Sequence, residues 1–150
     1  MAKKNTLKTL MNSDLPSILQ QKQKLYKPTL REVQELYDLL NQNVFDSKLK
    51  RPKIILKKCR GNLGWCIPYA NSRRRWCELI LRNRWYCVQW TITILAHEMA
   101  HQWEWDILGK APSHGKLFFI WKKKLERFGI PLKRCYYTDR WFKTQSLLKI

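Results

Sequence analysis

Apolar residues recur at helical spacing in the segment that follows Pro28-Thr29. The recurring positions are Leu30, Val33, Leu36, Tyr37, Leu40 and Val44. Residues spaced in this way lie on one face of a helix, so the pattern predicts an amphipathic helix that ends near Phe45-Asp46. Thr29 is a suitable N-cap, and Glu32 stands three positions later, as in a capping box. The first long element of the domain is therefore expected to start at Thr29.

Three short segments rich in β-branched and aromatic residues follow this helix. They are Ile54–Leu56, Leu63–Ile67 and Trp76–Arg82. Gly61-Asn62 separates the first two as a turn, and Pro68 is expected to stop the second. Short strands at this spacing predict a small three-stranded sheet that is antiparallel at least in part.

A long apolar run begins at about Tyr86 or Gln89 and reaches Leu108, where Gly109 is placed to end a helix. Apolar residues predominate on both sides of the motif within this run, at 88–96 and 103–108, which predicts a buried helix. Ser113 is expected to cap one more helix, from Gly115 to Phe128. The fold class is therefore α+β: a small three-stranded sheet packed with an N-terminal helix, a long buried helix and a following helix.

The two ends of the chain differ from this pattern. Residues 1–27 are rich in lysine, with Asp14 as the only acid, and they predict a flexible basic N-terminal arm. Within the arm, Ser13-Asp14-Leu15-Pro16 can cap a short helix that runs to Gln21. Residues 28–150 form one domain with its core at 30–129. The basic, aromatic segment 135–150 receives no assignment.

Composition narrows the class of protein. The 150 residues carry 30 Lys and Arg against 11 Asp and Glu, a net charge of +19, which predicts a polyanionic partner, with nucleic acid (DNA) ahead of an anionic membrane surface. No run is long enough to span a membrane, and the N-terminus lacks the apolar core of a signal peptide. The five cysteines include no C-x-x-C pair, which disfavours a disulfide scaffold or a zinc ribbon. An intracellular protein, cytoplasmic or in the nucleoid or nucleus and not secreted, is expected.

The candidate chemistry lies inside the apolar run, at His97-Glu98-Met99-Ala100-His101. Residues four apart lie on one helical face, so both imidazoles can reach one metal ion. Glu98 lies about 100° further round the helix, where it is poorly placed as a ligand beside them but well placed as a general base. The chain has 3 histidines, and this motif uses two of them. The pattern therefore predicts a catalytic zinc site.

A catalytic zinc site needs a third protein ligand. The metzincin spacing fails, because Glu104 stands in place of the glycine and Ile107 in place of the third histidine. A glutamate ligand downstream would have to be Glu126, which lies in a basic stretch. His114 remains as the candidate, and Gly109 and Pro112 allow the chain to turn before it. Glu104 shares the face of His97 and is a candidate for supporting the ligands or for an extra ligand.

These features together resemble the SprT-like metalloprotease domains, the group that includes Spartan and the bacterial SprT proteins. The resemblance spans residues 30–129 and is carried by Asn41–Leu49, Leu63–Cys66, Glu78–Leu81, Leu95–His101 and His114-Gly115 with Phe118. It implies a minimal zincin-like domain in which His97, His101 and His114 bind zinc and Glu98 is catalytic. It also implies proteolysis, often of proteins trapped on DNA. The zinc ribbon that many relatives carry at the C-terminus has no counterpart here.

The leading hypothesis is a zinc-dependent metalloendopeptidase that acts on DNA-associated or DNA-crosslinked proteins. The alternative is a DNA-binding protein whose zinc is structural, although such a site has no use for an acid at position 98. A zinc-dependent nuclease fits poorly, because position 107 is Ile where a third histidine is needed. The oligomeric state is left open.

Further expectations concern the substrate and the DNA. The strand Trp76–Arg82 is expected to be an edge that pairs with an extended peptide, and the candidates for stabilising the oxyanion are Tyr136, Tyr137 and Arg140. Basic clusters are expected to contact phosphates while nearby aromatic residues stack on bases. These residues are Lys48, Lys50, Arg51, Lys53, Lys57, Lys58, Arg60, Arg73–Arg75 and Lys122–Lys124, with Trp65, Trp76 and Trp85.

Overall fold

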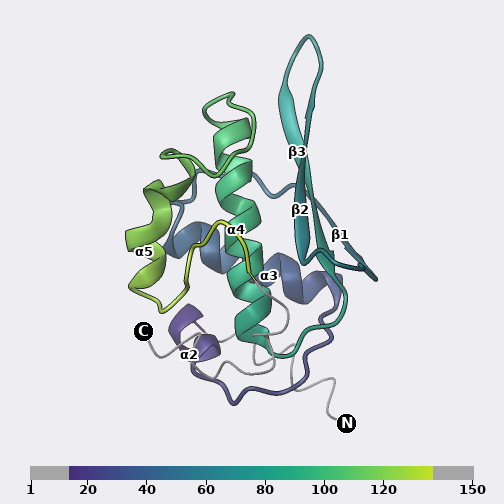
Figure 1. Ribbon diagram of the computed structural model, residues 1–150, viewed down its shortest axis with the longest axis vertical. Coiled ribbons are helices and arrows are strands. Elements are labelled where there is room, and N and C mark those ends of the chain that lie inside the picture. Colours follow the sequence, from purple (N-terminus) through teal and green to yellow (C-terminus); the bar gives the residue numbers. More distant parts are fainter. Residues whose placement is uncertain (1–13, 137–150) are drawn as a thin grey trace.

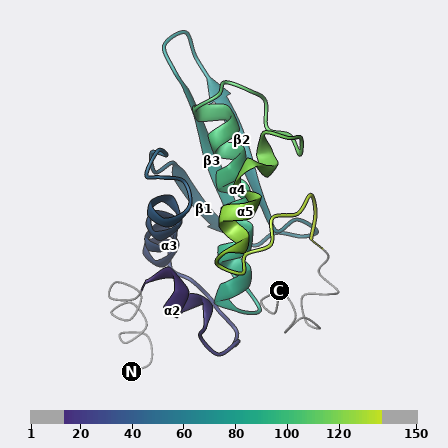
Figure 2. The same cartoon turned by 90° about the vertical axis from the view of Figure 1, so that its left-hand side faces the viewer.

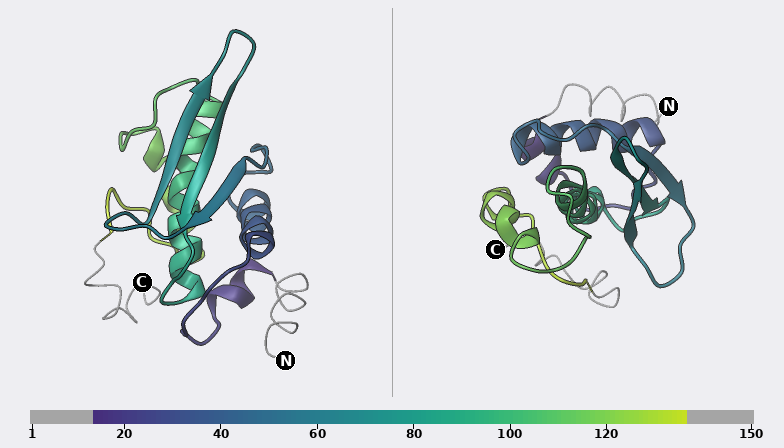
Figure 3. Two further views of the ribbon diagram at one scale, coloured as in Figure 1. Left: turned by 90° about the vertical axis from the view of Figure 1, so that its right-hand side faces the viewer. Right: turned by 90° about the horizontal axis from the view of Figure 1, so that it is seen from above.

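The computed structural model describes residues 14–136 of the chain. Its elements in chain order are α2 (Leu15–Leu19), α3 (Leu30–Asn43), β1 (Lys53–Lys57), β2 (Gly64–Ala70), β3 (Arg75–Arg82), α4 (Val88–Asp106), the 3₁₀ helix η1 (Phe118–Trp121) and α5 (Lys122–Glu126). Helix α4 runs through the centre, with the sheet on one side and η1 and α5 on the other (Figure 1; Figure 3, right). The predicted α+β class is confirmed.

Helix α4 is the central element of the fold, and both its apolar residues and most of its polar ones are buried. Every residue from Val88 to Glu104 is buried. The sheet packs against one side of this helix and η1 against another (Figures 1 and 2). The helix ends at Asp106, slightly earlier than predicted, and Gly109 follows with φ 65°, a conformation that glycine adopts without strain. A helix buried on all sides holds its side chains in fixed positions.

Helix α3 starts as the sequence predicts. The side chain of Thr29 accepts a hydrogen bond of 3.1 Å from the backbone N–H of Glu32. The apolar stripe of this helix is buried against the core, with Leu36 and Leu40 fully inaccessible to solvent. The helix ends at Asn43, a little before the predicted position.

Part of the predicted N-terminal arm is packed into the fold. Asp14 caps α2 by accepting a 2.9 Å hydrogen bond from the backbone N–H of Ser17, and Leu15 and Ile18 are fully buried. Further along, Tyr26 and Trp85 exchange two backbone hydrogen bonds of 2.8 Å. Residues 14–27 are thus part of the domain, whereas residues 1–13 of the predicted arm lie outside the described residues.

The sheet has the order β1-β3-β2. Strand β1 is parallel to β3, whereas β2 is antiparallel to it. The prediction that Trp76–Arg82 forms an edge is therefore wrong, because β3 is the central strand and β2 is an edge. Strand order depends on contacts between distant residues, which local patterns do not report.

Strand β2 also runs through Pro68, where the sequence pattern predicts a stop. The N–H of Arg82 donates to the carbonyl of Leu63, and that of Asn71 donates to the carbonyl of Arg74. Bonded and non-bonded pairs alternate along an antiparallel ladder. The even-numbered residues of β2 therefore point their backbone groups away from β3, so Pro68 removes no bond from the ladder.

The predicted helix from Gly115 to Phe128 is present as a shorter element in two parts, η1 and α5. Phe118 and Trp121 in η1 and Leu125 in α5 are its buried positions. Residues i and i+3 lie one above the other in a 3₁₀ helix, so this winding turns both rings toward the core. Among residues 14–136, no helix is both long and apolar enough to cross a membrane.

Replacing Gly64 by Ala should destabilise the contact between β2 and α4. A Cβ atom at Gly64 would lie 3.0 Å from Cδ2 of Leu81 and 3.1 Å from Cγ2 of Ile94, so strand and helix would have to separate slightly. We expect a loss of about 1–3 kcal/mol in the free energy of unfolding, measured by urea denaturation. Gly115→Ala is the control, since its Cβ would meet nothing closer than 3.5 Å, and an equal loss in both variants would contradict this packing.

Candidate metal centre

Helix α4 presents the His-Glu-x-x-His residues toward a cleft. His97 and His101 lie one turn apart, with ring centroids 4.9 Å from each other, and each is 7% exposed. Glu98 is 6% exposed. Because the helix is buried on both sides of these residues, the polar atoms that they carry face a small, defined space.

His114 joins the pair from the loop between α4 and η1. Its Nε2 atom lies 3.2 Å from Nε2 of His97 and 3.2 Å from Nε2 of His101. Two nitrogens bound to one tetrahedral zinc ion at about 2.0–2.1 Å are roughly 3.3 Å apart. Both distances from His114 match this spacing, and the ligand atoms of all three imidazoles lie within 4.8 Å of one another, so the three residues can hold a metal.

The ring of Phe118 contacts all three imidazoles. Its ring stacks on His101 at a centroid distance of 4.5 Å, and it meets the edges of His97 and His114 at 4.8 and 5.0 Å. The side chain is completely buried. The sequence places Phe118 on the apolar stripe of a predicted helix and in a family motif, and the structure shows that its ring contacts all three imidazoles.

Glu104 supports the ligands from the side, as one of the two predicted roles requires. Its carboxylate accepts a 3.0 Å hydrogen bond from Nδ1–H of His101, which leaves the lone pair of that ring on Nε2, facing the other histidines. The same carboxylate accepts from the backbone N–H of Ser113, next to His114. Glu104 thus connects the helix to the loop that carries the third imidazole.

The environment keeps the three histidines neutral, which is the form that binds a metal. Burial, followed by the charges of His101 and His114, lowers the pKa of His97 to about 3. Burial also lowers the pKa of His101, although its bond to Glu104 opposes this shift. The pKa of His114 is lowered by burial and then by Arg134. Neutral imidazoles each carry one nitrogen lone pair, so three of them that converge can bind a cation.

The pKa of Glu98 is raised, whereas the pKa values of the histidines are lowered. Burial raises the pKa of its carboxyl to about 8. Among residues 14–136, no hydrogen bond occupies this carboxylate, so it is available to a substrate or a water molecule. A cation held by the nearby imidazoles would favour the ionised form and lower this pKa. The residue can therefore exchange a proton near neutral pH.

The imidazoles and Glu98 lie in an open cleft of about 490 Å³. One side of the cleft is formed by the turn before β2 and by the first residues of that strand, and the other by the loops around His114 and Tyr136. Its lining residues are Gly61–Cys66, Ile94, His97, Glu98, His101, Pro112–His114 and Arg134–Tyr136. The backbone groups of Gly64 and Cys66 that point away from β3 thus border the same space as the histidines.

Two sequence predictions about aromatic residues need correction. The hydroxyl of Tyr136 donates to the carbonyl of Pro131 at 2.6 Å and accepts from the N–H of Lys133, so it is not available to an oxyanion. The Tyr136 ring instead forms a wall beside His97, at a centroid distance of 5.5 Å. Trp85 is 1% exposed and cannot stack on a base. The other oxyanion candidates, Tyr137 and Arg140, lie outside the described residues.

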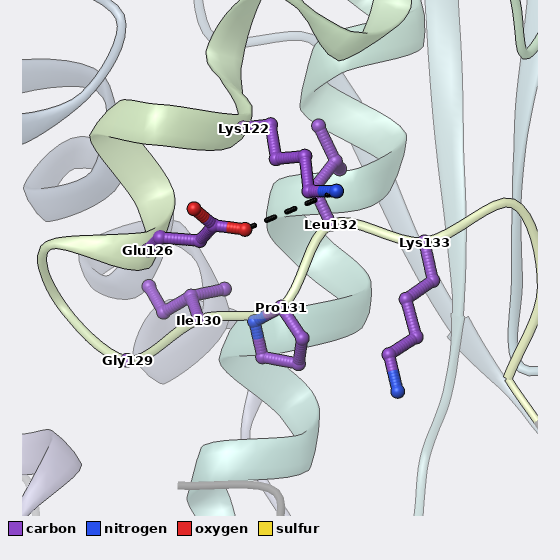
Figure 4. A pocket seen from close by; sticks show the side chains of 7 residues that line it. All are labelled: Lys122, Glu126, Gly129, Ile130, Pro131, Leu132 and Lys133. Carbon is purple, nitrogen blue, oxygen red and sulfur yellow. Dashed lines mark ion pairs between the residues drawn. The ribbon is translucent and has the colours of Figure 1, made fainter. Parts of the chain in front are cut away.

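A second, smaller cavity of about 140 Å³ lies between α5 and the segment that follows it (Figure 4). Its lining residues are Lys122, Glu126 and Gly129–Lys133. Lys122 and Glu126 form an ion pair of 4.0 Å at its rim, and the floor is apolar. None of these residues is a histidine or a cysteine, so this cavity offers no comparable metal-binding chemistry.

Comparison with known proteins agrees with the geometry. The model of the SprT-like family matches residues 33–136, which include the three histidines, Glu98 and Glu104. Neither the curated proteins nor the solved structures gave a match to the chain. The family is associated with metalloprotease-like domains, and the match covers more than half of the sequence. This chain therefore belongs to the SprT-like family.

Proposed function

We propose that this protein is a zinc-dependent endopeptidase that acts on proteins associated with DNA or crosslinked to it. One observation supports the chemistry above all others: three neutral imidazoles converge beside a buried carboxylate in a cleft bordered by β2, the edge strand of the described sheet. Family membership supports the same class of activity.

Zinc is the metal that we propose, because a set of three neutral imidazole nitrogens is typical of catalytic zinc sites. When bound, zinc supplies Lewis acidity, which polarises a carbonyl group and makes water a stronger acid. A structural zinc site is closed by four protein ligands, whereas the three histidines here face an open cleft. The open cleft and Glu98 favour catalysis over the alternative of a DNA-binding protein with structural zinc.

Different residues of the chain would bind the substrate and transfer the proton during hydrolysis. The outward backbone groups of Gly64 and Cys66 on β2 would pair with an extended substrate and hold it across the cleft. Glu98 would accept a proton from the attacking water at its carboxylate and pass it to the nitrogen of the leaving amine. Tyr136, at the far wall, would hold the His97 ring in place.

The DNA-associated substrate is inferred from charge. A net charge of +19 favours contact with a polyanion, and most of the basic clusters predicted from sequence lie on exposed residues of the described part of the chain. An intracellular location, in the cytoplasm or with the nucleoid or nucleus, is part of the same proposal.

The first prediction concerns the metal. His114→Ala should bind zinc far more weakly than the unaltered chain, because two imidazoles remain of three. Cys135→Ser changes another residue of the same cleft that is not among the three histidines, and it should retain a single zinc ion per chain. Competition with a chromophoric chelator measures both affinities. Full retention of zinc by His114→Ala would contradict the proposed ligand set.

The second prediction concerns Glu104. Glu104→Gln removes the anionic acceptor that orients His101, and supporting hydrogen bonds of this kind are worth about 10–100-fold in metal affinity. We expect a loss of that size, with some binding retained. Glu126→Gln is the matched control, since it makes the same change on an exposed residue of α5. The same competition assay applies, and equal affinities in the two variants would exclude an orienting role for Glu104.

The third prediction concerns catalysis. Glu98→Gln should keep its zinc but lose hydrolysis by roughly 10²–10⁴-fold, the usual contribution of a general base. The assay follows cleavage of a DNA-binding protein, with and without DNA and with and without a chelator. Glu126→Gln should cleave like the unaltered chain. Chelator-sensitive cleavage at full rate by Glu98→Gln would show that the proton acceptor is a different group.

A further inference from the structure

The sheet has one face that no helix covers within the described part of the chain. Helices α3 and α4 pack on the opposite face, and Figure 3 (left) shows the uncovered face turned toward the viewer. Side chains alternate between the faces of a strand. Because Ile54, Leu79 and Leu81 are buried on the helix side, their sequence neighbours point outward. We call this surface the open sheet face and define it by Trp65, Tyr69, Trp76, Lys53, Lys57 and Arg82.

The aromatic residues of the open sheet face form a flat, partly exposed surface. Tyr69 and Trp76 lie on paired positions of β2 and β3, and their rings stack at a centroid distance of 5.7 Å with 14° between the planes. Tyr69 is 38% exposed, and Trp65 is half-buried. Flat aromatic rings that reach the surface of a sheet provide surfaces on which other planar groups can stack.

Cations lie over and beside these rings. The guanidinium of Arg74, the residue directly before β3, lies 4.7 Å from the ring centre of Trp76, and Nζ of Lys57 lies 5.5 Å from that of Trp65. Lys53 is exposed on the same strand as Lys57. Glu78 contributes the opposite charge to this face. No ion pair among residues 14–136 involves Lys53, Lys57 or Arg74, so their charges remain available to an anionic partner.

We propose that the open sheet face binds single-stranded nucleic acid. Unpaired bases would stack on the exposed ring of Tyr69, which Trp76 supports from behind, and on Trp65, while Lys53, Lys57 and Arg74 would contact phosphates. Paired bases inside a duplex do not expose their faces for such stacking, so aromatic residues of this kind favour a single strand. The inference extends the nucleic-acid part of the proposed function and locates it on a surface separate from the imidazoles.

Strand β2 connects the open sheet face to the cleft. Strand β2 contributes its face to the nucleic-acid surface and its edge to the cleft, where Gly64 and Cys66 lie. A protein attached to a strand on the open sheet face would therefore be held beside the histidines. This arrangement fits a substrate that carries both a polypeptide and a nucleic acid.

Binding is measured by fluorescence anisotropy with labelled oligo(dT) of about 20 nucleotides, with oligo(rU) and with a duplex of the same length. We expect the single strands to bind at least about tenfold more tightly than the duplex, and more weakly as salt rises. The oligo(dT) and oligo(rU) arms show whether DNA or RNA is preferred. A duplex that binds as tightly as the single strands would overturn the proposal.

Two pairs of variants test the surface. Tyr69→Leu with Trp76→Leu removes the rings but keeps apolar side chains, and it should weaken oligo(dT) binding by about tenfold or more. Lys53→Glu with Lys57→Glu should also weaken binding. Lys22→Glu with Lys27→Glu makes the same change in net charge on exposed residues elsewhere, and it should bind nearly as tightly as the unaltered chain. Circular dichroism confirms that each variant is folded.

Equal losses in the two lysine pairs would mean that net charge alone governs binding, and this result would overturn the proposal. Unchanged binding by the Tyr69 and Trp76 variant would do the same. Displacement of the oligonucleotide by polyglutamate at an equal concentration of charge would assign the face to acidic polypeptides instead. The binding assay requires no hydrolysis, so a chain that binds oligo(dT) but cleaves no protein would refute only the peptidase proposal.

Discussion

The convergence of three neutral imidazoles on one point is the feature that the rest of this structure holds in place. Burial is the first cause that lowers the pKa of each ring below the ordinary histidine value, which favours the neutral form that binds a metal. Phe118 packs against the rings and restricts their rotation, and Glu104 fixes the tautomer of His101. Helix α4, which carries two of the imidazoles, is buried along nearly its whole length, and its packing keeps these rings in position.

The burial of α4 also explains the division of the protein into surfaces. One side of the helix packs against the sheet, and within residues 14–136 no helix packs on the opposite face of the sheet. Another side packs against η1, which carries Phe118 to the histidines. The cleft forms where neither neighbour covers the helix, between the start of β2 and the loop of His114. Position in the fold, rather than the motif alone, gives Glu98 its buried yet accessible place.

The parts of this arrangement that depend on near neighbours in sequence were predictable. The spacing of His97 and His101, the N-cap at Thr29 and the glycine at 109 are local signals, and the structure has each of them at the expected place. His114 could be nominated because the chain has few histidines, although its approach to the pair depends on a loop.

The parts that depend on distant contacts were not predictable in the same way. The order of the strands follows from how β1 returns beside β3, so the edge was assigned to the wrong strand. Trp85 lies in a basic stretch of the sequence, which favours a position on the surface. Its backbone pairing with Tyr26 instead places it in the core. The hydroxyl of Tyr136 is occupied by the backbone of Pro131, a contact that no spacing in the sequence reports.

Pro68 has a consequence for the behaviour of the protein at high concentration. A strand edge that accepts an extended peptide can also accept the same edge of another molecule, which is a common route to aggregation. Proline offers no N–H at that position, so the row of outward donors on β2 is interrupted in the middle. Short segments can still pair near Gly64 and Cys66, whereas a continuous ladder between two copies cannot form along the whole strand. The repulsion between two chains of charge +19 acts in the same direction, so the exposed edge is compatible with colloidal stability.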